Sequence, residues 1–555
     1  MAAPEHQDAF PYDLDTKQGL SEFLHRLDEY DLVSGDGGSF QLNPTERRQV
    51  AIFKNNLVVV ARGQRHMVET RQILDRARRK GIATNMIVET HLDNLIKIYD
   101  HHAGHSGDAG EPLDLDRQND LRKIISDAAR AKASDVHMRL LPKYLEIKIR
   151  VYGRMKSIAS RDPNEGAALM KAAFAVASGQ GASGTDTTFQ QGALTSKSGI
   201  LPPGVEMLRL QYSPMSEGRG ALVIRLKYRG KVGETEIDSL GYEPDQIKDI
   251  QVMRRRTNGM YLFSGKVSSG KSTTLQRVLN SMYEEKAGEV SIYTVEDPIE
   301  LDLPGAIQVE VSASNDAGRS EAFTKAIKAG LRSDPNVLVV GELRDKETAG
   351  LAIEAAMTGH ALWSTVHAGS ALGILSRLTD LEVESWKLED PTIVRGLIYQ
   401  RLIGTICPKC KVTIQEGLRQ RKMDEELFET MLAVTGQPKE ELFVRGPGCP
   451  DCDAGLNGRT VVAETVQTNQ TLLEHYVRGE RIEMKNYWVR PKADGGLGGM
   501  PTMHHAMIKV GAGISDINEI EEEVDLLNSY REQYPGLAET LVHDVNAYKA
   551  RNKIG

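Results

Sequence analysis

The chain has 555 residues, which exceeds one domain and predicts about three or four. Hydrophobic residues make up 40% of the chain and charged residues 26%, as in globular proteins with an ordinary core. The formal net charge of −8 argues against nucleic acid as the main partner, because nucleic-acid-binding proteins usually carry a basic surface. The sequence has neither an apolar run of about 18 residues nor an N-terminal basic region followed by an apolar core. We therefore expect a cytoplasmic protein that reaches a membrane only through partners.

The first part of the chain carries no motif with an evident chemical role. Residues 1–100 show mostly helical patterns, and we expect an N-terminal partner-binding domain there. The stretch from His101 to Gly110 is rich in glycine and histidine and predicts a linker over residues 101–117. Its three histidines could bind a metal, but a solvated linker is the simpler interpretation.

Two α/β domains are expected next, over residues 118–232 and 237–405. In the second domain strands alternate with helices, which predicts a parallel sheet covered by helices on both faces. The first domain is expected to contain a helix at Leu121–Ala133 and strands at Leu145–Val151 and Ala221–Lys227. The strands expected in the second are Tyr261–Phe263, Val290–Val295, Val337–Val340 and Leu362–Val366.

Residues 265–272 fit the phosphate-binding loop pattern G-x-x-x-x-G-K-[ST]. Glycines in such a loop let backbone N–H groups surround phosphate oxygens, while Lys271 supplies a positive charge and Ser272 a hydroxyl ligand for Mg²⁺. A Gly/Ser-rich loop could match by accident, but an apolar strand precedes this one and a helical pattern follows it. The sequence therefore predicts ATP binding, with contacts from Gly265, Ser268, Ser269, Gly270, Lys271, Ser272 and Thr273.

Acidic residues follow two of the predicted strands, where they could act on a bound nucleotide. Glu342 comes after Val337–Val340 and is predicted to activate the attacking water, although Gly341 stands where an aspartate is usual. Glu296 follows the preceding strand and is predicted to support Mg²⁺ through water. Either residue alone could be a helix cap or a solvated turn. His367, after the next strand, is predicted to sense the γ-phosphate, the alternative being a buried structural histidine.

All four cysteines fall in two C-x-x-C pairs, Cys407 with Cys410 and Cys449 with Cys452. Each pair can bring two sulfur ligands to one Zn²⁺ ion, so residues 406–460 are expected to form a zinc module. Disulfides and a redox motif are the competing interpretations, and a cytosolic setting disfavours the disulfides. Within this module, Glu416–Glu441 is expected to be helical. Residues 461–555 are expected to form a helical C-terminal part, with a loop at Lys492–Met500 and a helix at Asp516–Tyr530.

The order of these motifs resembles the ATPases of type II secretion and type IV pilus assembly over roughly residues 120–530. The loop at 265–272 is similar to the family's Walker A, 294–300 to its Asp box, 331–345 to its Walker B region and 358–367 to its His box. Gln400-Arg401-Leu402, Ala133–His137 and Arg150–Arg154 fit as well. The resemblance implies a RecA-like P-loop ATPase domain, preceded by a small PAS-like α/β domain, with the tetracysteine zinc module inserted. It further implies that Arg209 and Arg225 of the small domain complete the nucleotide site, with Arg219 as a weaker candidate.

The chain departs from the family pattern at Lys266 and Ser268, where proline and glycine are usual. The resemblance implies a homohexameric motor ATPase that works with an inner-membrane platform protein and uses ATP, Mg²⁺ and Zn²⁺. Pilus retraction ATPases lack the zinc module, so the resemblance points to pilus extension or secretion, and the function expected first is type IV pilus assembly. The alternatives are a type II secretion ATPase, a DNA-transfer or type IV secretion ATPase and, in another class, a zinc-ribbon nucleic-acid-binding protein.

Overall fold

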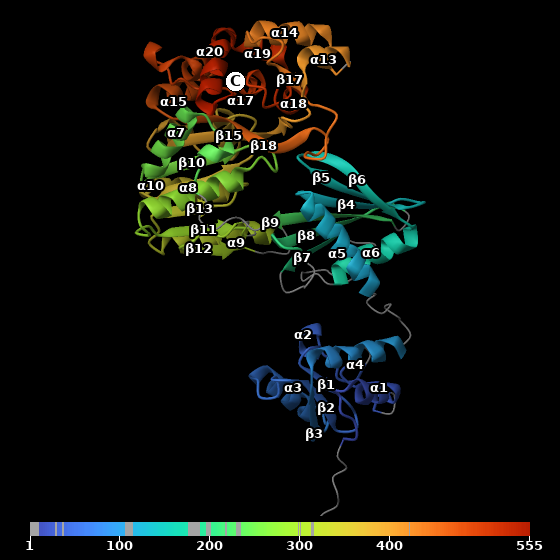
Figure 1. Ribbon diagram of the computed structural model, residues 1–555. Coiled ribbons are helices and arrows are strands. Elements are labelled where there is room, and N and C mark those ends of the chain that lie inside the picture. The colour runs from blue at the N-terminus through green and yellow to red at the C-terminus, as the bar shows by residue number, and fades with distance from the viewer. Residues whose placement is uncertain are drawn as a thin grey trace, which may run out of the picture. The chain divides into compact units, whose positions relative to one another are not determined.

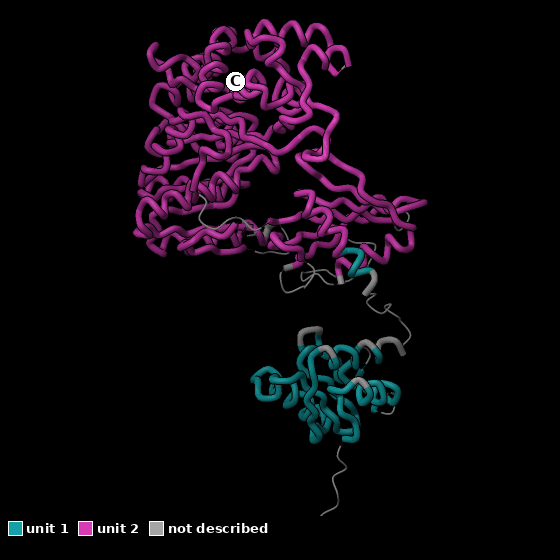
Figure 2. The backbone as a smooth tube through the Cα atoms, in the orientation of Figure 1, with its two compact units in different colours: residues 1–121 teal, residues 122–555 magenta. Residues whose placement is uncertain are grey.

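The computed structural model describes residues 10–554 except 28–29, 36–37, 106–114, 176–188, 196–200, 217–218, 229–234, 298, 300, 312–315 and 421. The chain divides into two compact units, residues 1–121 and 122–555 (Figure 2). Within the described ranges, no helix has both the length and the apolar character needed to cross a membrane.

The N-terminal unit is built around a three-stranded sheet (Figure 1). Strand β2 (Leu57–Ala61) lies between β1 (Val50–Ile52), which is antiparallel to it, and β3 (Met86–Thr90), which is parallel to it. Because parallel strands need a crossover connection, helix α3 joins β2 to β3. The helices of this unit are α1 (Lys17–His25), α2 (Pro44–Arg47), α3 (Val68–Arg79) and α4 (Leu92–His105). The expectation of a mostly helical region overlooked the apolar run Leu57–Ala61 that forms β2.

The expected linker overlaps helices at both of its ends. Helix α4 continues to His105, and α5 (Leu115–Arg130) begins before residue 117. The glycine- and histidine-rich composition gave no indication that its first residues complete a helix. The remainder, residues 106–114, lies outside the described part of the chain.

The larger unit begins with a six-stranded antiparallel sheet in the order β6-β5-β4-β9-β8-β7. Its apolar face is made by buried residues of the inner strands, such as Val136, Ile149 and Ile224, and helices α5 and α6 (Pro163–Ala175) cover it (Figure 1). The opposite face is polar, as the alternating burial along β5 indicates. The strands are β4 (Asp135–Leu140), β5 (Leu145–Val151), β6 (Arg154–Arg161), β7 (Gln190–Thr195), β8 (Val205–Pro214) and β9 (Gly220–Tyr228). Both strands expected here are confirmed, and the PAS-like assignment stays a prediction.

A seven-stranded sheet follows, in the order β12-β11-β13-β14-β10-β15-β18, and only β18 is antiparallel to its neighbour. Its strands are β10 (Gly259–Ser264), β11 (Ile292–Glu296), β12 (Ala306–Glu310), β13 (Val337–Val340), β14 (Ala361–Val366), β15 (Val394–Ile406) and β18 (Leu456–Gln467). Helices pack on both faces, as the alternation of strands and helices predicted. One face is covered by α7 (Pro244–Arg255) and α8 (Lys271–Glu285). The other is covered by α9 (Asp316–Leu331), α10 (Lys346–Met357), α11 (Gly373–Asp380), α12 (Ser385–Glu389), α15 (Gln470–Val477) and α16 (Arg481–Val489).

The remaining elements form a helical region over the ends of β15 and β18, with its own apolar cluster. They are the strands β16 (Val412–Thr413) and β17 (Phe443–Val444), and the helices α13 (Ile414–Arg419), α14 (Glu425–Thr435), α17 (Thr502–Gly511), α18 (Ile517–Glu523), α19 (Leu527–Gln533) and α20 (Pro535–Asn552). Among the described residues, single 3-10 turns lie at η4 (Asp238–Leu240) and η5 (Lys492–Asp494).

The two helices expected in the zinc module and near the C-terminus are each broken in two, so those predictions were wrong in extent. Asp424 caps α14 by accepting a hydrogen bond from the Leu427 N–H. Glu521 similarly accepts the N–H of Leu527, at the start of α19. Acidic side chains that serve as helix caps were thus mistaken for the polar face of a continuous helix.

Trp363 provides a test of the sheet's packing, because it is fully buried and stacks on Tyr261 at 4.5 Å between ring centroids. Trp363→Ala should lower the free energy of unfolding by about 3–5 kcal/mol, since a large cavity would remain. The matched control is Trp386→Ala, whose side chain is 56% exposed and should change stability by less than about 1 kcal/mol. Urea unfolding measures both, and equal effects would contradict the packing described.

Candidate nucleotide-binding site

The predicted phosphate loop connects the buried strand β10 to the start of helix α8. Gly265 has φ of 150°, and a Cβ there would lie 2.3 Å from the Gln400 carbonyl oxygen, so only glycine fits. Gly270 has φ of 85° and precedes α8, which begins at Lys271 and points its N-terminus at the loop. Lys271 Nζ donates to the carbonyl oxygens of Gly265 at 2.8 Å and Lys266 at 3.1 Å. The lysine ammonium therefore lies within the loop, where an incoming phosphate would meet it.

A buried chain of hydrogen bonds holds the loop against the neighbouring strand β15. Gln400, which is fully buried, donates through Nε2 to the Ser269 carbonyl at 2.8 Å. Its Oε1 accepts from the Tyr242 hydroxyl at 2.6 Å, and this hydroxyl also lies 3.4 Å from Thr274 Oγ1. Burial raises the pKa of Tyr242 well above its usual range, so the phenol stays protonated as a donor. The resemblance included Gln400, but no sequence signal marked Tyr242.

The ends of four neighbouring strands bring the predicted hydrolytic residues to one edge of the sheet. Strands β11, β13, β14 and β10 are adjacent and parallel, so their carboxyl ends lie together. Glu296 ends β11, Glu342 lies two residues after β13, and His367 directly follows β14. His367 Nε2 lies 3.0 Å from Glu342 Oε1, and Arg344 Nε donates to Glu342 Oε2 at 2.8 Å. The structure thus pairs two residues that the sequence analysis proposed separately for one site.

Glu296 lies on the next strand and is fixed by two donors. Its Oε1 accepts from Thr294 Oγ1 at 2.7 Å and from Gln308 Nε2 at 3.1 Å. Between the two acidic positions, a Cβ at Gly341 would lie 3.3 Å from the Val295 carbonyl oxygen, tighter than usual contacts. The crowding by β11 gives a physical reason for glycine where an aspartate was expected.

A cavity of about 540 Å³ lies between the phosphate loop and the polar face of the six-stranded sheet. Lys266 to Ser269 contribute the loop side. Asp135, Arg150 and Arg225 contribute the sheet side. Arg225 was predicted here, whereas Arg209 is not among the lining residues, and neither are Glu342 and His367. The cavity therefore covers the tip of the loop, and the sheet edge that carries Glu342 and His367 lies outside it.

Four charged residues form a row across the polar face of the six-stranded sheet. The register places Arg209 opposite Arg225, Arg225 opposite Asp135, and Asp135 opposite Arg150. Residues directly opposite one another in antiparallel strands share a face, so this row is continuous over β8, β9, β4 and β5. Arg225 Nε donates to Asp135 Oδ1 at 2.9 Å, and Asp135 is almost completely buried.

The row holds more positive than negative charge, and a histidine lies beside it. His137 lies two residues beyond Asp135 on β4. Burial lowers the pKa of His137, and the guanidinium groups of Arg150 and Arg225 act in the same direction, with Asp135 opposing them. Three arginines against one carboxylate are suited to an anionic ligand. Arg150 was part of the family resemblance but was not assigned to the site, although the alternation Leu-Glu-Ile-Lys-Ile-Arg-Val on β5 places it on the polar face.

Helix α18 closes the cavity with acidic side chains. Glu519, only 6% exposed, accepts a hydrogen bond from the Gly404 N–H, and burial raises its pKa. Arg154 lies 3.8 Å from both Glu519 and Glu522. Lys266 of the phosphate loop lies 3.4 Å from Glu523. The lysine that replaces the family's usual proline is thus matched by a carboxylate from the C-terminal region.

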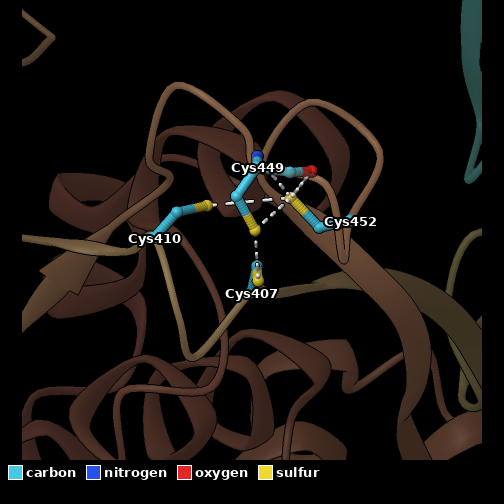
Figure 3. A group of neighbouring side chains, drawn as sticks. All are labelled: Cys407, Cys410, Cys449 and Cys452. Carbon is cyan, nitrogen blue, oxygen red and sulfur yellow. Dashed lines mark hydrogen bonds between the residues drawn. The ribbon is translucent and has the colours of Figure 1, made fainter.

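The four cysteines converge at the junction of β15 and β18, although they are separated along the chain (Figure 3). The Sγ atoms of Cys407 and Cys449 lie 3.8 Å apart, those of Cys410 and Cys452 3.7 Å, and those of Cys449 and Cys452 3.6 Å. A disulfide needs about 2.0 Å between sulfurs, so these atoms are not bonded. A tetrahedral Zn²⁺ with bonds of about 2.3 Å would place its sulfur ligands about 3.8 Å apart, which fits the group.

Ser268 should be a strained residue, because its φ of 63° is in the left-handed region that favours glycine. Ser268→Gly should therefore raise the free energy of unfolding by about 0.5–1 kcal/mol. The control is Ser269→Gly, a buried neighbour outside that region, which should not be stabilised. Thermal unfolding of both variants measures this, and a lower midpoint for Ser268→Gly would contradict the backbone conformation described.

The comparison with known proteins agrees with this geometry. The family described as "Type II/IV secretion system protein" matches residues 116–520. The chain is similar to "Type II secretion system ATPase E" of Vibrio cholerae serotype O1, with 30% identity over 370 residues, 66% of this chain and 68% of the relative. It is also similar to "Type II secretion system protein E" of Pectobacterium carotovorum, with 33% identity over 368 residues, 65% of this chain and 68% of the relative.

Among solved structures, the ATPase DotB of Legionella pneumophila aligns with a TM-score of 0.48 and 19% identity, covering 73% of this chain and 95% of that one. The pilus retraction motor PilT aligns with a TM-score of 0.40 and 25% identity, covering 56% of this chain and 89% of that one. The resemblance found from the motifs is confirmed by the family match across most of the chain. The chain belongs to the type II/IV secretion system protein family, a family of secretion ATPases.

Proposed function

We propose that the chain binds ATP with Mg²⁺ at the loop 265–272 and hydrolyses it at the adjoining sheet edge. The observation that supports this most is that a phosphate loop and a paired Glu342–His367 lie at the same edge. Lys271 and the loop N–H groups, from Gly265 through Ser269 and Gly270, would hold the phosphates. Ser272, at the start of α8 beside Thr273, would coordinate Mg²⁺, and the ion would neutralise charge on the transferring phosphate.

Glu342 is proposed to orient and deprotonate the attacking water. Its two oxygens already contact His367 and Arg344, and each carboxylate oxygen has a second lone pair for water. His367 is 55% exposed at its side chain, so it can also reach a phosphate at the same edge. Glu296, held by Thr294 and Gln308, is suited to bind a water of the Mg²⁺ shell.

The arginines across the cavity are proposed to stabilise the charge that develops on the phosphate. Arg225 and Arg150 line the cavity opposite the loop, with Arg209 next to Arg225 in the row. Since Glu342 is outside that cavity, the six-stranded sheet would have to approach the loop for all groups to act on one phosphate. Such a closing movement, repeated in a homohexameric ring, is how hydrolysis would become mechanical work.

The machine served is proposed to be a type II secretion system, not a type IV pilus. The sequence analysis put pilus assembly first, but the relatives reported above carry type II secretion names, and the findings favour that alternative. The chain would act as a cytoplasmic ATPase at the inner membrane, bound to the platform protein of the secretion machine.

Deleting the gene should then abolish export of folded exoproteins while surface pili remain, and the reverse result would restore the pilus assignment.

The cysteine group is proposed to hold one structural Zn²⁺. Cys407 follows β15 directly and Cys452 lies shortly before β18, so the ion would tie together the two ends of an insertion of about 50 residues. Burial raises the pKa of the Cys452 thiol, while hydrogen bonds from the backbone N–H groups of Cys449 and Gly455 lower it, and the net pKa is about 7. The ion would supply folding free energy and take no part in hydrolysis.

Lys271 is proposed to bind phosphate and Glu342 to activate water, so replacing each should cause a different defect. Lys271→Ala should lose nucleotide affinity, since the phosphate charge would be uncompensated. Glu342→Gln should keep affinity and lower turnover by about 10²–10⁴-fold, because an amide cannot accept the proton of water. Titration with a fluorescent ATP analogue and a phosphate-release assay measure both quantities. Near-normal turnover in Glu342→Gln would remove that residue from the role of base.

The arginine row predicts a second effect on turnover. Arg225→Ala should reduce turnover by about 10³-fold if its guanidinium stabilises the transferring phosphate. The control is Arg139→Ala, on β4 of the same sheet, where Arg139 donates to Glu146 at 3.1 Å and does not line the cavity. Because removing Arg225 leaves Asp135 buried without its partner, Arg225→Lys should retain folding and still lose activity. Wild-type turnover in Arg225→Lys would contradict the role.

Metal analysis tests the cysteine group. The purified chain should contain about one Zn²⁺, and Cys407→Ser should lower both metal content and thermal stability, since metal binding contributes to folding. Lys409→Ser, in the same turn but without a ligand atom for zinc, is the matched control. Elemental analysis that finds no zinc, together with a titration that finds no free thiols, would instead support disulfides.

A further inference from the structure

A strongly basic segment lies within the N-terminal unit of this acidic chain. Between Arg47 and Lys80 there are ten lysine or arginine residues and only two acidic ones. The preceding residues, 1–46, show the reverse, with ten acidic residues and two basic ones. The segregation holds along the sequence, and only those cations that also lie together on the folded surface without acidic neighbours would attract an anionic partner.

Helix α3 presents much of this charge to solvent. Its buried side consists of Thr70, Ile73, Leu74 and Ala77. Residues 68, 71, 75 and 79 are spaced three or four apart on the opposite side and therefore share one exposed face. Arg71 and Arg79 are the cations of that face, and Arg78 borders it.

Some of the nearby cations are already paired, and others are not. Arg62 pairs with Asp15, Arg65 with Glu89, Arg76 with Glu46 and Arg78 with Asp75. Within the described ranges, Arg48, Arg71, Arg79 and Lys80 have no acidic partner. The contact of Arg76 with Glu46 and that of Thr70 with Gln49 place the turn bearing Arg48 along α3.

Two exposed apolar side chains stand at the beginning of the same helix. Met67 is 49% exposed and Val68 63%, and Arg65 and Arg71 flank them along the chain. At an anionic bilayer, apolar side chains enter the boundary between headgroups and acyl chains while guanidinium groups bind the phosphates. An acidic protein surface would satisfy the arginines, but it would gain nothing from Met67 and Val68 unless it also offered an apolar recess.

We propose that this face, formed by Arg65 to Val68 and the exposed side of α3 to Lys80, binds directly to a membrane surface containing anionic phospholipid. The helix would lie along the surface, with Met67 and Val68 inserted and Arg71, Arg79 and Lys80 on headgroup phosphates. This contact adds to any attachment through a partner protein. It does not depend on the ATPase mechanism.

Vesicle sedimentation with the full chain tests the proposal. The chain should bind vesicles of phosphatidylglycerol and phosphatidylcholine, but not phosphatidylcholine alone, and the binding should weaken as salt is raised. Arg71→Gln with Arg79→Gln should weaken binding about thirtyfold, since each cation near the surface contributes about fivefold. Met67→Ser with Val68→Ser should also weaken it and leave a binding that is more sensitive to salt.

The matched control is Lys97→Gln with Lys123→Gln, which removes the same charge from exposed positions on α4 and α5. Its binding should equal that of the unchanged chain. Thermal unfolding checks that all variants remain folded. No binding to phosphatidylglycerol vesicles at low salt, or equal loss in the control and the Arg71/Arg79 variant, would overturn the proposal and favour an acidic protein as the partner.

Discussion

The parallel register of β11, β13, β14 and β10 is the constraint on which the proposed chemistry depends. Because these strands are neighbours and run the same way, Glu296, Glu342, His367 and the phosphate loop all leave the sheet at one edge. The buried link from Tyr242 through Gln400 to Ser269 then fixes the loop against β15. If one of these strands shifted its register by one residue, its side chains would turn to the other face of the sheet and would no longer reach the site.

The second part of the site comes from a different kind of sheet. In the six-stranded antiparallel sheet, pairing sets side chains opposite one another, and this produces the row of Arg209, Arg225, Asp135 and Arg150. Within this crowded row, Asp135 holds the guanidinium group of Arg225 in an ion pair. A phosphate group would compete with that carboxylate, so nucleotide binding and movement of the row are expected to be coupled. Such a movement would also change the contacts of the acidic residues of α18, Glu519 with Arg154 and Glu523 with Lys266.

Much of this arrangement was predictable from the sequence, because it depends on local patterns. The apolar strands of the ATPase core, the loop 265–272 and the two cysteine pairs follow from spacing alone. What the sequence could not give depends on distant contacts: the hydrogen bond of Tyr242 to Gln400, the pairing of Glu342 with His367, and the place of Arg150 beside Asp135. The continuous helices expected at Glu416–Glu441 and Asp516–Tyr530 are each broken in two. Asp424 and Glu521 accept N–H groups at the start of the second helix in each pair, and composition alone does not distinguish such residues from the solvated face of one long helix. In the N-terminal unit, β2 (Leu57–Ala61) is an apolar run as clear as that of β13 and was overlooked, whereas β1 has only three residues and gives no recognisable period.

In the proposed mechanism, the loop holds one phosphate and the arginine row stabilises it while Glu342 holds the attacking water. A structure of the assembled protein with Mg²⁺ and a non-hydrolysable ATP analogue would show whether these groups meet. We expect γ-phosphate oxygens within hydrogen-bonding distance of Lys271 Nζ and of a guanidinium from Arg150, Arg209 or Arg225, in the same or a neighbouring chain. We also expect a water between Glu342 and the phosphorus. A γ-phosphate bound at the loop with all three arginines remaining distant in every chain of the assembly would contradict the mechanism.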